Sequence, residues 1–154
     1  LQLIADFGGT TLWPMIALSN IAQGSAVLAI IFLHRGNEKE EQVSIPAAIS
    51  CYLGVTEPAM FGINIKYIYP FVAAMIGSGI AGLVATTFNV MANSIGVGGI
   101  PGFLSIQTDS MAMFIVCMAI AIVVPFLLTV LFEKKQLFAP KGEVEDAPVI
   151  QTQK

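Results

Sequence analysis

The chain divides into long stretches without charged residues, separated by short polar segments. No Asp, Glu, Lys or Arg lies between Asp6 and Arg35, between Lys66 and Asp109, or between Asp109 and Glu133. A helix that crosses the hydrocarbon core of a bilayer needs about 20 mainly apolar residues. The pattern therefore predicts three membrane-spanning helices, near residues 12–34, 68–89 and 110–132.

The segment near residues 44–66 has the length of a span but a different internal pattern. Its centre contains Gly54, Glu57, Pro58 and Gly62. Proline and glycine interrupt a helix, and irregular backbone at membrane depth is tolerated only where it is buried in protein or lines a cavity. We therefore interpret this segment as a re-entrant hairpin, which leaves the membrane on the side where it entered.

The positions of the basic residues favour the hairpin over a full crossing. If the hairpin returns, Arg35, Lys66, Lys134 and Lys135 all lie on one side of the membrane. If it crossed, the last three would lie on the opposite side from Arg35. Lysine and arginine beside membrane spans accumulate on the cytoplasmic side. The charges therefore predict a cytoplasmic location for these residues and for the C-terminal tail.

Composition excludes an ordinary soluble domain. The 154 residues are 56% hydrophobic and 11% charged, whereas a soluble domain carries about 25% charged residues, and the mean hydropathy is +0.81. A net charge of −3 without a basic patch indicates no nucleic-acid partner. The polar residues 133–154 contain prolines and acidic residues and no helical periodicity, so we expect a disordered tail. Because the first residue is Leu1, we expect a fragment of a longer protein.

Neither metal nor covalent chemistry is indicated. Cys51 and Cys117 each lie alone in an apolar stretch, without the spacing of a metal or redox motif, and are expected to be buried. Residues 96–102, with four glycines and a proline, predict an irregular loop that dips back from the outer face. This loop lacks the lysine motif of phosphate-binding loops. We assign no catalytic residue, no metal site and no cofactor.

Glu57 is the main candidate for function. A carboxylate at membrane depth costs about 2.5 kcal/mol or more, and such residues mark functional sites. Thr56 and Asn64 add hydroxyl and amide groups nearby, and this set of acceptors and donors suits the hydroxyl groups of a sugar. The predicted substrate-binding residues are therefore Thr56, Glu57 and Asn64. The structural alternative is a carboxylate that braces the hairpin through backbone N–H groups.

Residues 54–64, Gly-Val-Thr-Glu-Pro-Ala-Met-Phe-Gly-Ile-Asn, resemble the motif of enzyme IIC subunits of the phosphoenolpyruvate-dependent sugar phosphotransferase system, glucose superfamily. Within it, residues 91–107 and the opening of the chain are most similar to trehalose-specific IIBC permeases. The resemblance implies that residues 1–132 are the C-terminal part of a IIC transport domain and that residues 133–154 are a cytoplasmic tail. It also implies a multi-pass protein of the bacterial inner membrane, and a homodimer.

The resemblance further implies uptake of a disaccharide, with trehalose as the expected sugar, coupled to its phosphorylation. The sugar would bind Thr56 and Glu57, and a phosphocysteine on the IIB domain of the full-length chain, charged by a IIA protein, would phosphorylate it. The sugar-binding histidine of the family lies upstream, and His34 is not assigned that role. The IIB cysteine motif is absent from these residues. Three alternatives remain: a sucrose- or maltose-type permease, an ion-coupled transporter with Glu57 as a proton or sodium site, and a structural membrane module.

Overall fold

The structure, a computed structural model, describes residues 6, 8–135 and 137. The described part is helical and contains no β-strand, apart from two isolated bridges that Ala92 makes to Thr10 and to Ile106. The all-α prediction is therefore confirmed for these residues. The elements are α2 (Leu12–Leu33), α3 (Glu38–Tyr52), α4 (Glu57–Ala59), the π-helix η1 (Met60–Asn64), α5 (Ile65–Tyr67), α6 (Tyr69–Thr87), the 3₁₀ helices η2 (Ile100–Ser105) and η3 (Thr108–Ser110), and α7 (Met111–Lys134).

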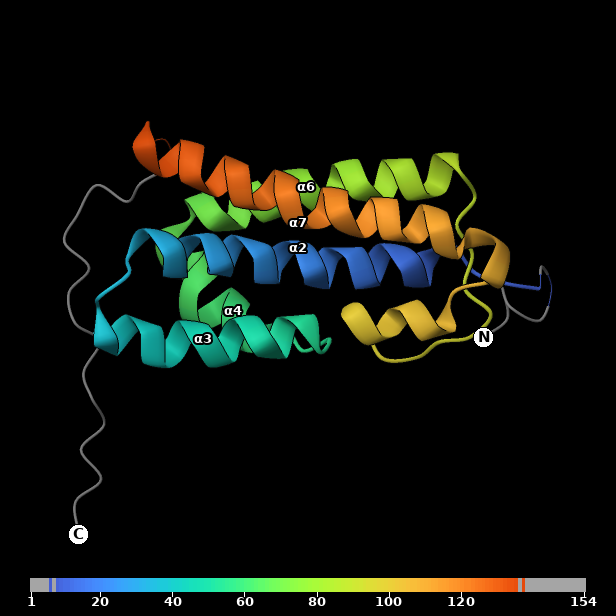
Figure 1. Cartoon of the computed structure of the whole chain (residues 1–154), viewed down its shortest axis with the longest axis horizontal. Coiled ribbons are helices and arrows are strands. Elements are labelled where there is room, and N and C mark those ends of the chain that lie inside the picture. The colour runs from blue at the N-terminus through green and yellow to red at the C-terminus, as the bar shows by residue number, and fades with distance from the viewer. Residues whose placement is uncertain (1–5, 7, 136, 138–154) are drawn as a thin grey trace, which may run out of the picture.

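Helices α2, α6 and α7 run side by side and form the body of the molecule (Figure 1). Each is long and apolar enough to cross a membrane, with the third helical stretch counted from Thr108 to Lys134. Small residues let the helices approach closely, as is usual in lipid. A Cβ atom placed on Gly77 of α6 would overlap the ring of Pro125 in α7, 2.6 Å from its Cδ. A glycine at this position is therefore required for the observed contact between α6 and α7.

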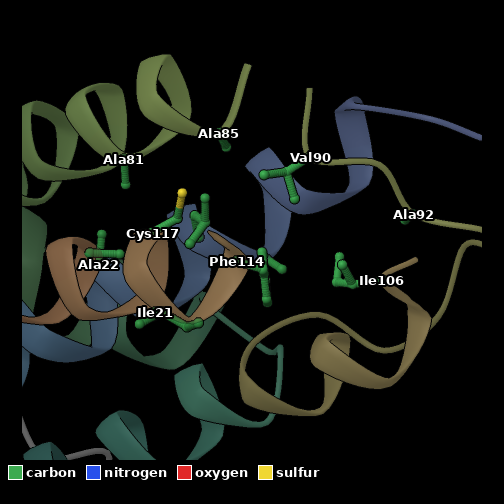
Figure 2. Packing of buried hydrophobic residues seen from close by; sticks show 12 residues of the cluster. Ile21, Ala22, Ala81, Ala85, Val90, Ala92, Ile106, Phe114 and Cys117 are labelled. Atoms are coloured by element: carbon green, nitrogen blue, oxygen red, sulfur yellow. The ribbon is translucent and has the colours of Figure 1, made fainter. Parts of the chain in front are cut away.

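The larger of two buried apolar clusters lies where these three helices meet the loop that follows α6 (Figure 2). Phe114 of α7 is its largest fully buried side chain, and alanines fill much of the remaining space. Because lipid is as apolar as the core, the gain here comes from close packing rather than from the exclusion of water. The cluster contains Ala17, Leu18, Ile21, Ala22, Ala81, Ala85, Val90, Ala92, Ile106, Phe114, Cys117 and Ala121.

The segment between α2 and α6 is a hairpin. Helix α3 runs back along α2, and α4, η1 and α5 return toward the end where α3 began (Figure 1). The two arms meet there: a Cβ on Gly62 would lie 3.5 Å from Cγ1 of Val43, and the Tyr67 hydroxyl donates a hydrogen bond to Glu40. The first arm begins at Glu38 rather than near residue 44, because three acidic residues in its first turn favour a helix N-terminus.

A polar group of five side chains, here called the end cluster, joins the ends of the helices at the base of the hairpin. His34 Nδ1 lies 2.9 Å from Glu40 Oε2, and His34 Nε2 lies 3.1 Å from Glu133 Oε1. The Tyr69 hydroxyl donates to Glu133 at 3.3 Å. Burial, and then the hydrogen bond to Glu40, raise the pKa of the Tyr67 hydroxyl, so it stays protonated and donates at neutral pH.

At the opposite end, the chain between α6 and α7 turns back along α2. Its first part is irregular, and its second part forms η2, which lies beyond the tip of α3 on the same side of α2 (Figure 1). A Cβ on Gly102 would lie 3.1 Å from Cβ of Ala17 in α2. The predicted irregular loop is thus partly a 3₁₀ helix. Residues 136 and 138–154, most of the predicted disordered tail, lie outside the described residues.

Candidate functional site

The tip of the hairpin is a tight turn between α3 and α4. Its backbone groups are satisfied locally: Gly54 N–H donates to Cys51 O at 3.0 Å, and Val55 N–H donates to Ser50 O at 2.8 Å. The Ser50 hydroxyl returns a hydrogen bond to Val55 O at 3.0 Å. Gly54 has a φ of +101°, a conformation that L-residues rarely adopt. The turn therefore needs no partner from outside this chain for these N–H groups.

The structure brings Thr56 and Glu57 together but separates Asn64 from them. Thr56 is half-buried at the end of the turn, and Glu57 is exposed as the first residue of α4. The Glu57 carboxylate makes no hydrogen bond or salt bridge to another described residue. Asn64 is 0% exposed, and neither its amide nitrogen nor its amide oxygen has a described partner. Glu57 thus faces out of this chain, whereas Asn64 is enclosed within it.

The π-helix between these residues explains the separation. In a continuous α-helix Glu57 and Asn64, about two turns apart, would lie on one face. A π-helical turn between Met60 and Asn64 contains one extra residue, which rotates the following residues by about 100°. This turn moves Asn64 off the face that carries Glu57. Ile68 then has a φ of +63°, rare for a β-branched residue, at the point where α6 takes its new direction.

The hairpin tip contacts the glycine-rich loop, residues 96–102, and the contact is made by the backbones of both segments. A Cβ on Gly54 would lie 2.9 Å from the N, C and O atoms of Gly98, and a Cβ on Gly99 would overlap the carbonyl oxygen of Tyr52. On the α2 side, the Asn20 amide nitrogen donates to Gly54 O at 3.3 Å. We call this contact of Gly54, Gly98 and Gly99 with Asn20 the tip junction. Two motifs far apart in the sequence therefore meet beside α2.

Sequence reasoning missed the polar face of α2. Asn20 and Gln23 are separated by three positions, so they lie on the same side of this helix, and Gln23 Oε1 is buried without a described hydrogen-bond partner. On another side of the helix, two residues after Gln23, the Ser25 hydroxyl pairs with the Tyr52 hydroxyl at 2.8 Å. The signal that could have revealed this face is the presence of amide side chains in the middle of an apolar span.

The chemistry available at the tip is hydrogen bonding. The exposed Glu57 carboxylate offers acceptors, and the adjacent Thr56 hydroxyl can both donate and accept. Cys51 and Cys117 are buried, and no group of three or more metal-ligating side chains occurs among residues 6, 8–135 and 137. The described site thus suits the recognition of a polar, hydroxyl-bearing ligand.

Comparison with known proteins gives consistent matches. The family described as "Phosphotransferase system, EIIC" matches residues 5–78. The chain is 60% identical over 129 residues to the PTS system trehalose-specific EIIBC component of Escherichia coli (strain K12), covering 84% of this chain and 27% of that protein. It is 52% identical over 127 residues to the trehalose-specific EIIBC component of Bacillus subtilis (strain 168), covering 82% and 27%. These matches confirm the resemblance inferred from residues 54–64.

A sucrose-specific relative is less similar. The PTS system sucrose-specific EIIBC component of Pasteurella multocida (strain Pm70) is 46% identical over 137 residues, which cover 87% of this chain and 29% of that protein. No solved structure matches the chain. The chain thus spans little more than a quarter of the length of the curated relatives it matches.

Proposed function

This chain belongs to the phosphotransferase system EIIC family, and on that premise we propose that it is the C-terminal part of the membrane domain of a disaccharide permease. Family membership and three long apolar helices make it a membrane-embedded protein. In the proposal, residues 1–132 belong to the sugar-transporting domain and residues 133–154 form a cytoplasmic tail. The membrane is the bacterial inner membrane.

The observation that carries the proposal is the unpaired, exposed carboxylate of Glu57 at the hairpin tip. The tip lies beside Asn20, in the interior of the α2 span rather than at its ends. A carboxylate at such depth is costly unless it gains partners. Sugar hydroxyls donate hydrogen bonds to a carboxylate, and charge-assisted bonds of this kind are about twice as strong as neutral ones. Thr56, next in sequence, supplies a further contact.

Trehalose is the proposed sugar. The two trehalose-specific relatives are 60% and 52% identical to this chain, whereas the sucrose-specific relative is 46% identical. We propose that the sugar binds from outside and moves inward. A phosphocysteine of the IIB domain, recharged by a IIA protein, then transfers its phosphoryl group to a sugar hydroxyl. The remaining partners are the bilayer and a second copy of the full-length protein.

Replacing Glu57 by glutamine in the full-length permease tests the site. Glutamine keeps the shape but removes the charge, and the loss of a charge-assisted hydrogen bond costs about 1.5–3 kcal/mol. We expect trehalose affinity, measured by calorimetry, to fall at least about tenfold. Glu38→Gln is the matched control, because Glu38 is an exposed carboxylate at the other end of the same hairpin. Unchanged affinity in folded Glu57→Gln would refute the assignment.

Two further measurements separate the alternatives. Sucrose and maltose titrated in place of trehalose identify the disaccharide, and a sucrose affinity above that for trehalose would reassign the sugar. Uptake into vesicles with and without phosphoenolpyruvate distinguishes the permease from an ion-coupled transporter. The proposal expects sugar phosphate inside the vesicles and no collapse with an uncoupler. Uptake of unmodified sugar that an uncoupler abolishes would favour the ion-coupled alternative.

A further inference from the structure

We propose that Asn20 is a positioning residue for the sugar site, which holds the hairpin tip against the glycine-rich loop and so orients Thr56 and Glu57. This inference rests on the proposed function, because it assumes that Thr56 and Glu57 bind the sugar. Asn20 itself is not proposed to touch the sugar. Its role is to act on both residues through Val55, which separates Gly54 from Thr56 and Glu57.

A hydrogen bond joins α2 to the hairpin tip. The Asn20 amide donates to Gly54 O at 3.3 Å, across 34 residues of sequence. The other described hydrogen bonds of the turn come from α3 or from the turn itself: Ser50 and Cys51 supply the acceptors for its N–H groups. The Asn20 bond thus joins α2 to the turn itself, whereas the Ser25–Tyr52 hydroxyl pair joins α2 to the last residue of α3. Loss of the Asn20 bond would leave the turn attached through α3 and through backbone packing.

The Asn20 amide is tightly packed between the hairpin tip and the loop. A Cβ placed on Gly98 would overlap Asn20 Nδ2, and the same Cβ position lies 3.4 Å from Gly54 Cα. The amide therefore fills the space between two glycine backbones that belong to different re-entrant segments. A larger side chain at Gly98 would push the amide away from Gly54 O. A smaller side chain at position 20 would leave a gap between the hairpin tip and the loop.

The proposed sugar-binding carboxylate, Glu57, lies close to this contact in the sequence. Glu57 starts α4 with its carboxylate exposed and unpaired in the described part of the chain, so no side-chain bond there fixes its orientation. Helix α4 begins directly after the turn, and this turn is held at Gly54 by the Asn20 amide. A shift at Gly54 is consequently transmitted to both Thr56 and Glu57, and displacements of about 1 Å are enough to weaken a preorganised site.

The test uses the full-length permease with Asn20→Ala and Asn20→Asp, and with Gly98→Ala, which disturbs the same contact from the loop. Ser19→Ala is the matched control, because Ser19 is the neighbouring half-buried polar residue of α2 but lines the groove against α6. Trehalose affinity is measured by calorimetry. Spin labels at Val55 and Val97, two exposed residues beside the tip and in the loop, report the distance between the two segments without sugar.

We expect each Asn20 variant and Gly98→Ala to weaken trehalose binding about two- to tenfold, and to broaden the Val55–Val97 distance distribution. Ser19→Ala should change neither quantity. Combined with Glu57→Gln, the Asn20→Ala effect on affinity should become smaller than in the wild-type background, since residues that act through one another are not additive. The part of the effect that acts through Thr56 should remain.

Two results would overturn the inference. A distance distribution that stays narrow in both Asn20 variants would mean that the amide does not hold the junction. A broadened distribution with wild-type trehalose affinity would make Asn20 a structural residue only. Failure of the proposed function gives a different result: the Glu57→Gln variant would then bind trehalose with wild-type affinity. The distance between the labels at Val55 and Val97 would still report whether Asn20 holds the tip.

Discussion

Gly54→Ala is the substitution that tests the tip junction most directly. The added methyl group would lie 2.9 Å from the N, C and O atoms of Gly98, and these are backbone atoms that cannot rotate away. The residue would also have to keep a φ of +101°. A left-handed conformation costs an L-residue about 1–2 kcal/mol, and overpacking in a tight interior costs about 1–3 kcal/mol more. Gly54→Ala should therefore lower the free energy of unfolding by about 2–5 kcal/mol in total.

Gly36→Ala separates these two costs. Gly36 has a φ of +102°, almost the same as Gly54, but a Cβ there would meet nothing within 4 Å. Gly36→Ala should therefore lower the free energy of unfolding only by the cost of the left-handed conformation, about 1–2 kcal/mol. The measurement is the free energy of unfolding of the full-length permease in detergent, together with trehalose affinity. Equal destabilisation by Gly54→Ala and Gly36→Ala would refute the close contact between hairpin tip and loop.

Two further predictions follow from the hairpin and from the helix packing. Cysteines introduced at Asn37, at Lys66 and in the tail should be labelled from the cytoplasmic side, and one at Thr108 from outside; labelling at Lys66 from outside alone would mean that the segment crosses the membrane. Gly77→Ala should destabilise the protein by about 1–3 kcal/mol despite the better helix propensity of alanine, because the added methyl group would overlap Pro125. Unchanged thermal stability of this variant would contradict the close packing of α6 against α7.

The sequence alone determined the membrane character and the three long helices of this protein. Both follow from where charges are absent, and a run of about 20 apolar residues has few options other than a helix in lipid. It also predicted the hairpin, because Glu57 and its neighbouring Pro58 are incompatible with a simple span. The motif around Glu57 was sufficient to identify the family that the comparisons then confirmed.

Only the tertiary structure decided how the two irregular segments meet and where the site residues point. Contact between Gly54 and Gly98 depends on backbone shapes far apart in sequence, and no local pattern encodes it. The π-helical turn adds a residue to one helical turn, so the face on which Asn64 lies was not readable from spacing. The same holds for the hydrogen bond of Asn20: an amide in an apolar span signals a buried partner, but only the packed helices show that this partner is the carbonyl of Gly54.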